Sequence, residues 1–554
     1  MKLFFKKPMV LETIGYLAVI VMVFQRAVLP PDGWLLFGDD IHRAYYFFRE
    51  FFNVWMSRGV FPWWNPYLFG GTPFIADPIV NIWYPVNWVF LVLPLNIAYS
   101  WHVIIHLLWA ATGMCVLVKL VTGNRFAAWV SGLVFMMSGF FMARTWSGHV
   151  DVIAAASWMP WVIYLFTRLL LDERRDRRGI ILAGIVFAFQ LLSGYQTMAF
   201  MTVIIIGVMS VVFAVRGYSV AGLVRSVTAG IFGIGLAAFH LVPVAEFFRS
   251  SIRTYPLPYS WISFGSWTPK SLIQMLSPFY FGDQRMYNGP PPNFGEHSAF
   301  IGVIGLLLAV IGVYAVWLSS RIKKRPVSAV FLLGTSAIIT VIFGVWMSLG
   351  ASVPVDLQYI AWKIIPMYQY LRIPTRHLIL VVFGLSLLSG IGASYLLIRL
   401  RVVRLIGWAV ALFVIIEMVP FGRHFIEMHP IPEARHEADL VKLLTADKQP
   451  YRVLQNFGVW VEARDSLDFD SVMPYGIFSA TGYSPSILRP YYEYIARATG
   501  VSGEEAMLSH DVQVPYLAPT QAETLDFLNI KYILVPPDHD PFAGNPRYRL
   551  IWDD

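Results

Sequence analysis

The chain has 554 residues, of which 57% are hydrophobic and only 14% charged, and its mean hydropathy is +0.59. A water-soluble domain could not bury so much apolar surface, whereas a set of membrane spans can. The formal net charge of +8 would suggest nucleic acid as a partner of a soluble protein, but here the basic residues gather in short turns between apolar segments. Composition therefore predicts a polytopic membrane protein with no nucleic acid among its partners.

Segments of about 20 apolar residues, the length that crosses a bilayer, recur along the chain. Eleven such spans are predicted: 10–29, 97–121, 126–143, 151–170, 179–195, 197–215, 222–243, 298–319, 328–349, 377–398 and 403–420. The first follows a lysine-rich start and is expected to remain as an uncleaved anchor. The segment 79–94 is short and broken by Pro85 and Pro94, so we expect it to be re-entrant or interfacial.

The turns between the predicted spans differ in charge. Basic clusters fall on one side when crossings are counted from a cytoplasmic N-terminus: 168–178, 216–225, 321–325 and 399–404. Cytoplasmic turns are enriched in Lys and Arg, so this side is assigned to the cytoplasm. The long loops then fall outside, together with everything after residue 420.

Hydropathy falls after about Gly422, which marks a change of structure. Strands are predicted at 451–454 and 530–535, and helices at 433–444 and 523–528. We therefore expect an all-α polytopic membrane core over residues 1–420, which includes the first outer loop at 30–96. A small extracytoplasmic α/β domain is expected over residues 421–554.

Asp39 and Asp40 are the leading candidates for chemistry. They follow the first span and precede an aromatic-rich helix predicted at 41–58. A carboxylate there could accept a proton from a hydroxyl or hold a divalent cation such as Mg²⁺ or Mn²⁺. Asp is also a favoured helix N-cap, so one of the two could simply cap that helix.

A second candidate group lies where two predicted spans meet outside. His149 and Asp151 follow Arg144 closely in the sequence. A His and an Asp at a membrane mouth could bind a hydroxylated substrate or a metal, or could simply be hydrated at the interface.

Several arginines lie on the predicted outer side, against the charge rule, so each needs a partner. Arg253, Arg372 and Arg376 are the main ones. A lipid phosphate is one such partner, because a guanidinium binds phosphate through two parallel hydrogen bonds. The alternative is ion pairing with outer carboxylates such as Glu246 and Glu296.

Some motifs are missing from the sequence. No Gly-Lys-Ser/Thr phosphate loop occurs, and the inner turns are too short to build a nucleotide-binding domain. A transferase of this kind would therefore use an activated donor already in the membrane. Few ionisable residues lie within spans, chiefly Glu12, His240 and Glu417, whereas an ion-coupled transporter usually needs such groups near the midplane.

Short motifs follow one another in a characteristic order along most of the chain. They are Gly38-Asp39-Asp40, Trp64-Asn65-Pro66, Gly70-Gly71-Thr72-Pro73, Tyr84-Pro85, Gly148-His149, Trp158-Met159-Pro160-Trp161, Gly194-Tyr195-Gln196-Thr197, Arg372-Ile373-Pro374-Thr375-Arg376 and Leu528-Asn529-Ile530-Lys531-Tyr532. Their order resembles that of the YfhO-like family of bacterial membrane proteins, which is thought to belong to the GT-C superfamily of membrane glycosyltransferases.

The resemblance implies a polyprenyl-phosphate sugar lipid as donor. The acceptor would be an envelope glycan, glycolipid or protein at the outer face of a bacterial-type cytoplasmic (inner) membrane. GT-C enzymes need an acidic residue in the first outer loop, which here is Asp39 or Asp40.

Further residues join this hypothesis as substrate contacts. Arg372 and Arg376 would neutralise the leaving phosphate. The aromatic first loop, with Trp64 and Tyr84, would stack sugar rings and seat the prenyl chain. The other candidate contacts are His149, Asp151, Glu246, Arg253 and Glu296.

Two other functional classes remain open from the sequence. A lipid or polysaccharide transporter would show altered flux, without a covalent product, when the aspartates are changed. A non-catalytic membrane scaffold would depend on residues 421–554 and not on the aspartates.

Overall fold

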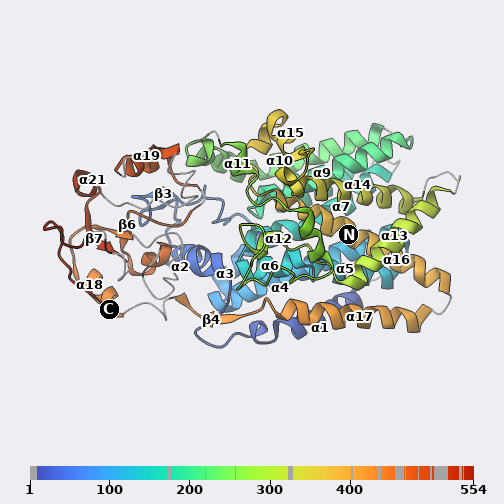
Figure 1. The fold of residues 1–554 in the computed structure, drawn as a ribbon, viewed down its shortest axis with the longest axis horizontal. Coiled ribbons are helices and arrows are strands. Elements are labelled where there is room, and N and C mark those ends of the chain that lie inside the picture. The colour runs from blue at the N-terminus through green and yellow to red at the C-terminus, as the bar shows by residue number, and fades with distance from the viewer. Residues whose placement is uncertain are drawn as a thin grey trace. The chain divides into compact units, whose positions relative to one another are not determined.

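The structure is a computed structural model of the chain (Figure 1). It describes residues 9–171, 177–218, 220–255, 257–321, 328–400, 403–432, 438–455, 467, 469–484, 486–498, 502–504, 522–535, 540 and 542–553.

The described residues contain nine helical segments that are long and apolar enough to cross a bilayer. They are formed by α1 (Val10–Val28), α4 (Leu95–Thr122), α5 (Arg125–Met136) with α6 (Gly139–Ser147), α7 (Val150–Leu171), α9 (Gln196–Val215), α10 (Val220–Arg249), α13 (Val303–Ser320), α14 (Ala329–Leu349) and α16 (Leu378–Leu400). Two further helices, α8 (Arg177–Leu192) and α17 (Val403–Arg423), coincide with the remaining predicted spans. The mainly helical membrane fold is thus confirmed, and the count of eleven crossings stays a prediction.

Shorter elements connect these helices. The helical ones are η1 (Ile41–Tyr45), α2 (Tyr46–Ser57), η2 (Pro85–Trp88), α3 (Val89–Val92), η3 (Ile252–Thr254), α11 (Tyr259–Ile262), η4 (Pro269–Met275), α12 (Phe294–His297), η5 (Gly350–Ser352), α15 (Leu357–Ile364), η6 (Pro366–Gln369), η7 (Pro374–His377), α18 (Ala438–Ala446), η9 (Phe469–Tyr475), α19 (Arg489–Ala498) and α21 (Ala522–Phe527). The strands are β1 (Trp34–Leu36), β2 (Trp64–Asn65), β3 (Thr72–Pro73), β4 (Met428–Pro430), β5 (Arg452–Gln455), β6 (Phe478–Ser479) and β7 (Ile530–Leu534).

The chain divides into two compact units, and each is discontinuous in sequence. Unit 1 consists of Met1–Pro30, Tyr99–Phe239 and Pro258–Glu427. Unit 2 consists of Pro31–Ala98, His240–Leu257 and Met428–Asp554. The first outer loop therefore shares a unit with the C-terminal region, whereas the sequence grouped it with the membrane core; the boundary at residue 420 stays a prediction.

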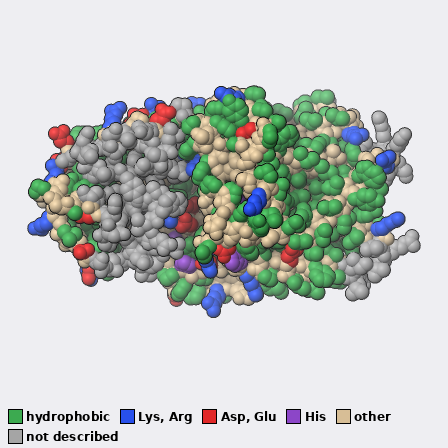
Figure 2. Space-filling model, in the orientation of Figure 1, with side chains coloured by type: hydrophobic (Ala, Val, Ile, Leu, Met, Phe, Trp, Pro, Cys, Tyr) green, Lys and Arg blue, Asp and Glu red, His purple; other side chains and the backbone are tan. Residues whose placement is uncertain are grey.

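Unit 1 is built around α16, which packs against α13, α14 and α5 (Figure 1). Glycines allow the backbones of α13 and α16 to touch: a Cβ on Gly312 would lie 2.1 Å from the Leu388 carbonyl oxygen, and one on Gly392 would lie 1.9 Å from that of Leu308. Small residues bring membrane helices together in this way, because lipid provides no hydrophobic force between them. Hydrophobic side chains cover most of the visible face over α13 and α16 (Figure 2).

Two of the acidic residues within predicted spans have structural partners in unit 1. Glu12 of α1 forms an ion pair with Arg125 of α5, with 2.7 Å between Oε1 and Nη2. Glu417 of α17 accepts hydrogen bonds from the backbone N–H groups of Val303 and Ile304, at 2.5 and 3.2 Å. It thus satisfies donors that the first turn of α13 would otherwise leave unpaired inside the membrane.

Unit 2 joins segments that are distant in the sequence. Strand β1 pairs antiparallel with β4, with Leu35 opposite His429. A parallel sheet with strand order β6-β5-β7 forms from the C-terminal region. Its strands β5 and β7 confirm the two predicted strands, while the start of the helix predicted at 433–444 lies outside the described residues.

The first loop of unit 2 follows the sequence-based expectations. The helix predicted at 41–58 is present as η1 followed by α2. The segment 79–94 holds only the short turns η2 and α3, so it contains no helix long enough to cross a bilayer.

The Gly70-Gly71 motif of this loop has a packing role. Gly70 and Gly71 have φ angles of 68° and 113°, which side chains rarely allow. A Cβ on Gly71 would lie 2.7 Å from Nε1 of Trp64. The glycines therefore let the chain turn back so that β3 pairs with β2, and Gly71 leaves room for the Trp64 indole.

Candidate functional site

The two first-loop aspartates begin the helix that continues through η1 and α2. Asp39 pairs with Arg43 one turn later, with 3.0 Å between Oδ1 and Nε, and both side chains are partly exposed. Asp40 makes no side-chain capping hydrogen bond. Its Oδ1 instead accepts a hydrogen bond from the hydroxyl of Tyr483 at 3.1 Å. The structure therefore does not use Asp40 as a helix cap.

Tyr483 comes from the C-terminal region of unit 2 and is held there by its own backbone. Its N–H donates to Oδ1 of the buried Asp470 at 2.8 Å. The carboxylate of Asp40, together with burial, raises the pKa of Tyr483 well above its usual value. The phenol therefore stays protonated and can donate to Asp40 throughout the physiological pH range.

Ser484, the next residue, makes a similar contact with a second carboxylate of the first loop. Its Oγ donates to Oδ2 of Asp77 at 3.0 Å, and the Ile79 N–H donates to Oδ1 at 3.0 Å. Burial outweighs these two hydrogen bonds and raises the pKa of Asp77 to about 6. Two consecutive residues of the C-terminal region thus donate hydrogen bonds to Asp40 and Asp77 of the first loop.

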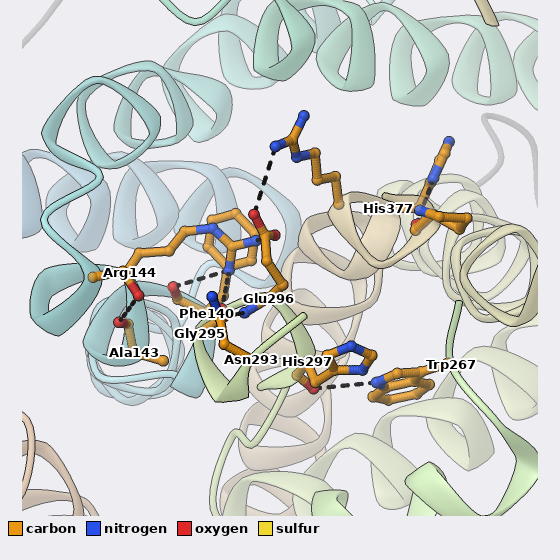
Figure 3. A network of polar contacts seen from close by, with 12 residues as sticks. Phe140, Ala143, Arg144, Trp267, Asn293, Gly295, Glu296, His297 and His377 are labelled. Carbon is orange, nitrogen blue, oxygen red and sulfur yellow. Dashed lines mark hydrogen bonds and ion pairs between the residues drawn. The ribbon is translucent and has the colours of Figure 1, made fainter. Parts of the chain in front are cut away.

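A second group of charges lies within unit 1. Arg144 of α6 is fully buried, and its Nη2 donates to Oε2 of Glu296 in α12 at 2.8 Å. Its Nη1 donates to the Gly295 carbonyl oxygen at 3.1 Å, and its guanidinium lies 3.8 Å from the centroid of the Phe140 ring (Figure 3). Arg376 of η7 lies on the other oxygen, with 3.6 Å between Nη2 and Oε1 of Glu296.

Glu296 therefore stays ionised although it is buried. Burial alone would raise its pKa, but the guanidiniums of Arg144 and Arg376 outweigh burial and hold the pKa at about 2. His149 lies close enough to be affected by the charge of this carboxylate. Burial lowers the pKa of His149 to about 4, so its imidazole is neutral near pH 7.

Arg372 and Arg376 diverge from a strained turn. Ile373 has a φ of 66°, an unfavourable angle for a β-branched residue, and its N–H donates to the Ile262 carbonyl oxygen at 3.2 Å. The Arg372 guanidinium lies 4.3 Å from the centroid of the Trp261 ring. The turn therefore sends one guanidinium onto an aromatic surface and the other to Glu296.

Six of the predicted site residues fall into two sets. His149, Asp151, Glu296 and Arg376 come together in unit 1, where Asp151 acts electrostatically on Arg376. Asp39 and Asp40 belong to unit 2.

Four other predicted residues lie elsewhere in unit 2. Tyr84 is buried in the interior, and Trp64 is half-exposed in β2. Glu246 is exposed near the end of α10, and Arg253 lies in η3. The structure does not place these four in one group.

The sequence did not identify three residues that the structure brings into these groups: Tyr483, Asp77 and Tyr195. The Arg376 guanidinium lies 5.6 Å from the Tyr195 ring centroid. Tyr195 stood in a motif that resembles the family pattern, which was an available signal. Tyr483 and Asp77 showed no comparable pattern in the sequence.

Asp39 or Asp40 was also the predicted metal ligand. No group of three or more His, Cys, Asp or Glu side chains within the described residues could hold a metal ion. Asp39 and Asp40 would therefore hold Mg²⁺ or Mn²⁺ only together with phosphate and water oxygens, a common mode for Mg²⁺.

The fold of this chain is similar to that of solved structures, although comparison by sequence finds no match. No family model matches the chain, and no curated protein matches it. An oligosaccharyltransferase of Archaeoglobus fulgidus in its apo form matches 96% of this chain and 70% of its own, with 13% identity and a TM-score of 0.50.

Two other solved structures are also similar. ArnT from Cupriavidus metallidurans bound to undecaprenyl phosphate matches 84% of each chain, with 13% identity and a TM-score of 0.45. The arabinofuranosyltransferase AftD from Mycobacteria matches 89% of this chain and 34% of its own, with 11% identity and a TM-score of 0.49. Of these three structures, the archaeal oligosaccharyltransferase alone has a TM-score of 0.50. The chain has the fold of the GT-C membrane proteins.

Proposed function

We propose that this protein is a membrane glycosyltransferase that moves a sugar from a polyprenyl-phosphate-linked donor to an envelope acceptor. The observation that carries the proposal is the fold shared with an oligosaccharyltransferase over 96% of the chain. The proposal includes membership of the YfhO-like family and action at the outer face of a bacterial-type cytoplasmic membrane, with the N-terminus inside.

We assign the activation of the acceptor hydroxyl to the carboxylate of Asp39 or Asp40. Asp39 or Asp40 takes the proton of the acceptor hydroxyl as its oxygen forms a bond to the anomeric carbon. The bond from that carbon to the donor phosphate breaks, and the phosphate leaves with the electron pair. The hydrogen bond from Tyr483 supports this role for Asp40, because it favours the ionised carboxylate.

We assign the binding of the donor phosphate to a guanidinium of unit 1. Arg376 is about a quarter exposed and makes one ion pair, at 3.6 Å, among the described residues. Its remaining N–H groups suit a phosphate oxygen, where negative charge grows as the sugar departs. Arg144 is fully engaged with Glu296 and backbone carbonyl oxygens, so its role is to hold Glu296 in place.

The test measures sugar transfer by the purified full-length protein. A radiolabelled polyprenyl-phosphate sugar mixture is incubated with envelope material and with wild type, Asp39→Asn or Asp40→Asn. Loss of a general base reduces the rate by about 10²- to 10⁴-fold, so we expect one variant to lose transfer to that extent. The matched control is Asp439→Asn, which removes a highly exposed carboxylate paired with Lys442 in α18.

Three outcomes contradict parts of the proposal. Wild-type transfer in both variants overturns the catalytic assignment. Lipid or polysaccharide flux without a covalent product favours the transporter. Neither product nor flux, with a function that is lost on removal of residues 421–554, favours the scaffold.

A further inference from the structure

The connection between α14 and α16 carries a short helix, α15, with one apolar exposed face. Tyr359, Ile360 and Ile364 are 41%, 44% and 72% exposed. Lys363 is exposed beside them. Residues three or four apart lie on one face of a helix, so these four side chains form a single surface.

The opposite face of α15 is packed into unit 1. Gln358 is fully buried, and Leu357 and Ala361 pack against a buried cluster of Met347, Tyr368 and Leu371. The N-terminus of the helix is capped by Asp356, which accepts hydrogen bonds from the Tyr359 N–H and the Tyr259 hydroxyl. The exposed face is therefore held in a fixed orientation.

The chain after α15 continues the exposed apolar surface. Ile365, Met367 and Tyr370 are each more than two-fifths exposed. Hydrophobic side chains crowd the upper edge of the molecule in Figure 2, where Figure 1 places α15. Large exposed apolar patches are rare in water and mark surfaces that bind something.

The topology limits what can cover this surface. The helices on either side, α14 and α16, are both long and apolar enough to cross the bilayer. The connection over residues 350–377 lies at one membrane boundary, because it starts and ends at the same side of two consecutive spans. The exposed apolar face of α15 is therefore within reach of lipid.

The polar groups of this face also suit a lipid headgroup region. The Lys363 Nζ lies 4.8 Å from the centroid of the Trp362 ring and 5.6 Å from that of Tyr359. Tyr and Trp favour the membrane interface, and a lysine stem can run along apolar surface while its ammonium reaches a phosphate.

We propose that residues 355–370 form an interfacial anchor, with the apolar face of α15 inserted among lipid headgroups and Lys363 bound to an anionic lipid phosphate. Amphipathic helices bind membranes in this way through buried apolar area and attraction to anionic lipid. The anchor does not depend on sugar transfer and holds the segment that leads into Arg372 and Arg376.

The test places a spin label on the exposed face. Cys115 is the single cysteine of the chain and is buried, so Cys115→Ala provides the background. Ile364→Cys is labelled with a nitroxide in proteoliposomes of phosphatidylcholine and phosphatidylglycerol. Lys442→Cys, on the exposed surface of α18, is the matched control. Electron paramagnetic resonance then compares collisions with oxygen, which partitions into the bilayer, and with a water-soluble nickel chelate.

We expect the label at position 364 to collide several-fold more with oxygen relative to nickel than the control does. Ile360→Cys, on the same face, repeats the result if the first variant folds poorly. A nickel-accessible label at both positions overturns the anchor, and so does protection from both quenchers, which indicates a covering protein.

A second arm tests the charge. Lys363→Glu in the labelled protein should raise nickel accessibility in vesicles with phosphatidylglycerol and leave it unchanged in pure phosphatidylcholine. Equal behaviour in both lipids overturns the assignment of Lys363 to an anionic phosphate.

Discussion

The group of charged side chains around Glu296 in unit 1 (the unit 1 centre) and the group around Asp39 and Asp40 in unit 2 (the unit 2 centre) differ in their ratio of carboxylates to guanidiniums and in their exposure to solvent. In unit 1 one carboxylate, Glu296, is shared by two guanidiniums and is buried. In unit 2 two neighbouring carboxylates have different partners: Asp39, about two-fifths exposed, pairs with Arg43, and Asp40 accepts a hydrogen bond from the Tyr483 hydroxyl.

This difference in burial distinguishes charged groups that stabilise the fold from charged groups that can exchange a proton. A buried ion pair whose hydrogen bonds are satisfied cannot change its charge without a large cost. A partly exposed carboxylate can gain and lose a proton at little cost. The unit 1 centre is therefore suited to a permanent charge, and the partial exposure of the unit 2 centre is compatible with the proton transfer proposed for it.

The largest expected effect comes from Glu296→Gln. This change leaves the buried Arg144 without its counter-ion, which typically costs about 3–5 kcal/mol. Thermal unfolding of the full chain in detergent measures the loss. The control is Glu427→Gln, whose partner Arg285 is 62% exposed and whose expected cost is at most about 1 kcal/mol. Equal losses would refute the contrast between buried and exposed pairs.

The pH dependence of stability tests the same centre. The folded pKa of Glu296 is about 2, below its ordinary value near 4.5, so the folded state favours the ionised form. Its contribution is fully present above about pH 4.5 and disappears as the pH falls towards 2. Glu296→Gln should therefore have its largest effect near neutral pH and little effect near pH 2.

Asp77→Asn tests the buried carboxylate that Ser484 contacts. The folded pKa of Asp77, about 6, lies above its ordinary value near 3.8, so the stability contributed by the neutral carboxyl is present below about pH 4 and is lost as the pH rises to about 6. The amide removes this loss, and we expect stabilisation of up to about 3 kcal/mol at pH 8 that vanishes below pH 4. Denaturation of wild type and variant at pH 8 and below pH 4 measures this difference in the free energy of unfolding. A less stable variant at pH 8 would mean that the Ser484 and Ile79 hydrogen bonds require the full charge.

Tyr483→Phe tests whether the C-terminal region supports Asp40 in its proposed catalytic role. Hydrogen bonds to charged groups contribute about 1.5–3 kcal/mol, so transfer should fall by about tenfold or more while the protein stays folded. The control is Tyr491→Phe, whose hydroxyl donates to the Ala480 carbonyl oxygen in the same unit. Equal losses of transfer would make the Tyr483 contact merely structural.

Arg43→Gln is expected to have the smallest effect on stability. Its pair with Asp39 is partly exposed and one helical turn apart, and such pairs contribute about 0.3–0.5 kcal/mol. Thermal unfolding should therefore barely change. A loss comparable with that of Glu296→Gln would show that the unit 2 centre is also a structural ion pair.

The sequence predicted those helices whose formation depends on a local pattern of residues. Hydropathy located a helical segment at each of the eleven predicted spans, because each span is apolar over its own length. The helix at 41–57 followed from its aromatic run and its position after the aspartates.

The sequence could not predict contacts made by distant segments. Tyr483 reaches Asp40 across 443 positions, and neither residue carries a periodic signal that identifies the other. The sharing of Glu296 between Arg144 and Arg376 was one of several ion-pairing alternatives, and only packing selected it. The grouping of the first loop with the C-terminal region depends on the same long-range contacts.

The pairing of β1 with β4 has a consequence for biosynthesis. Trp34 lies opposite Pro430, so β1 has no partner until roughly 400 further residues have been made, which takes about 20–80 s at ordinary rates of translation. The aspartates that follow β1 therefore reach their final surroundings only after most membrane helices have been inserted. A chain cut short before residue 430 would contain most of the membrane helices but would lack the β4 partner of β1.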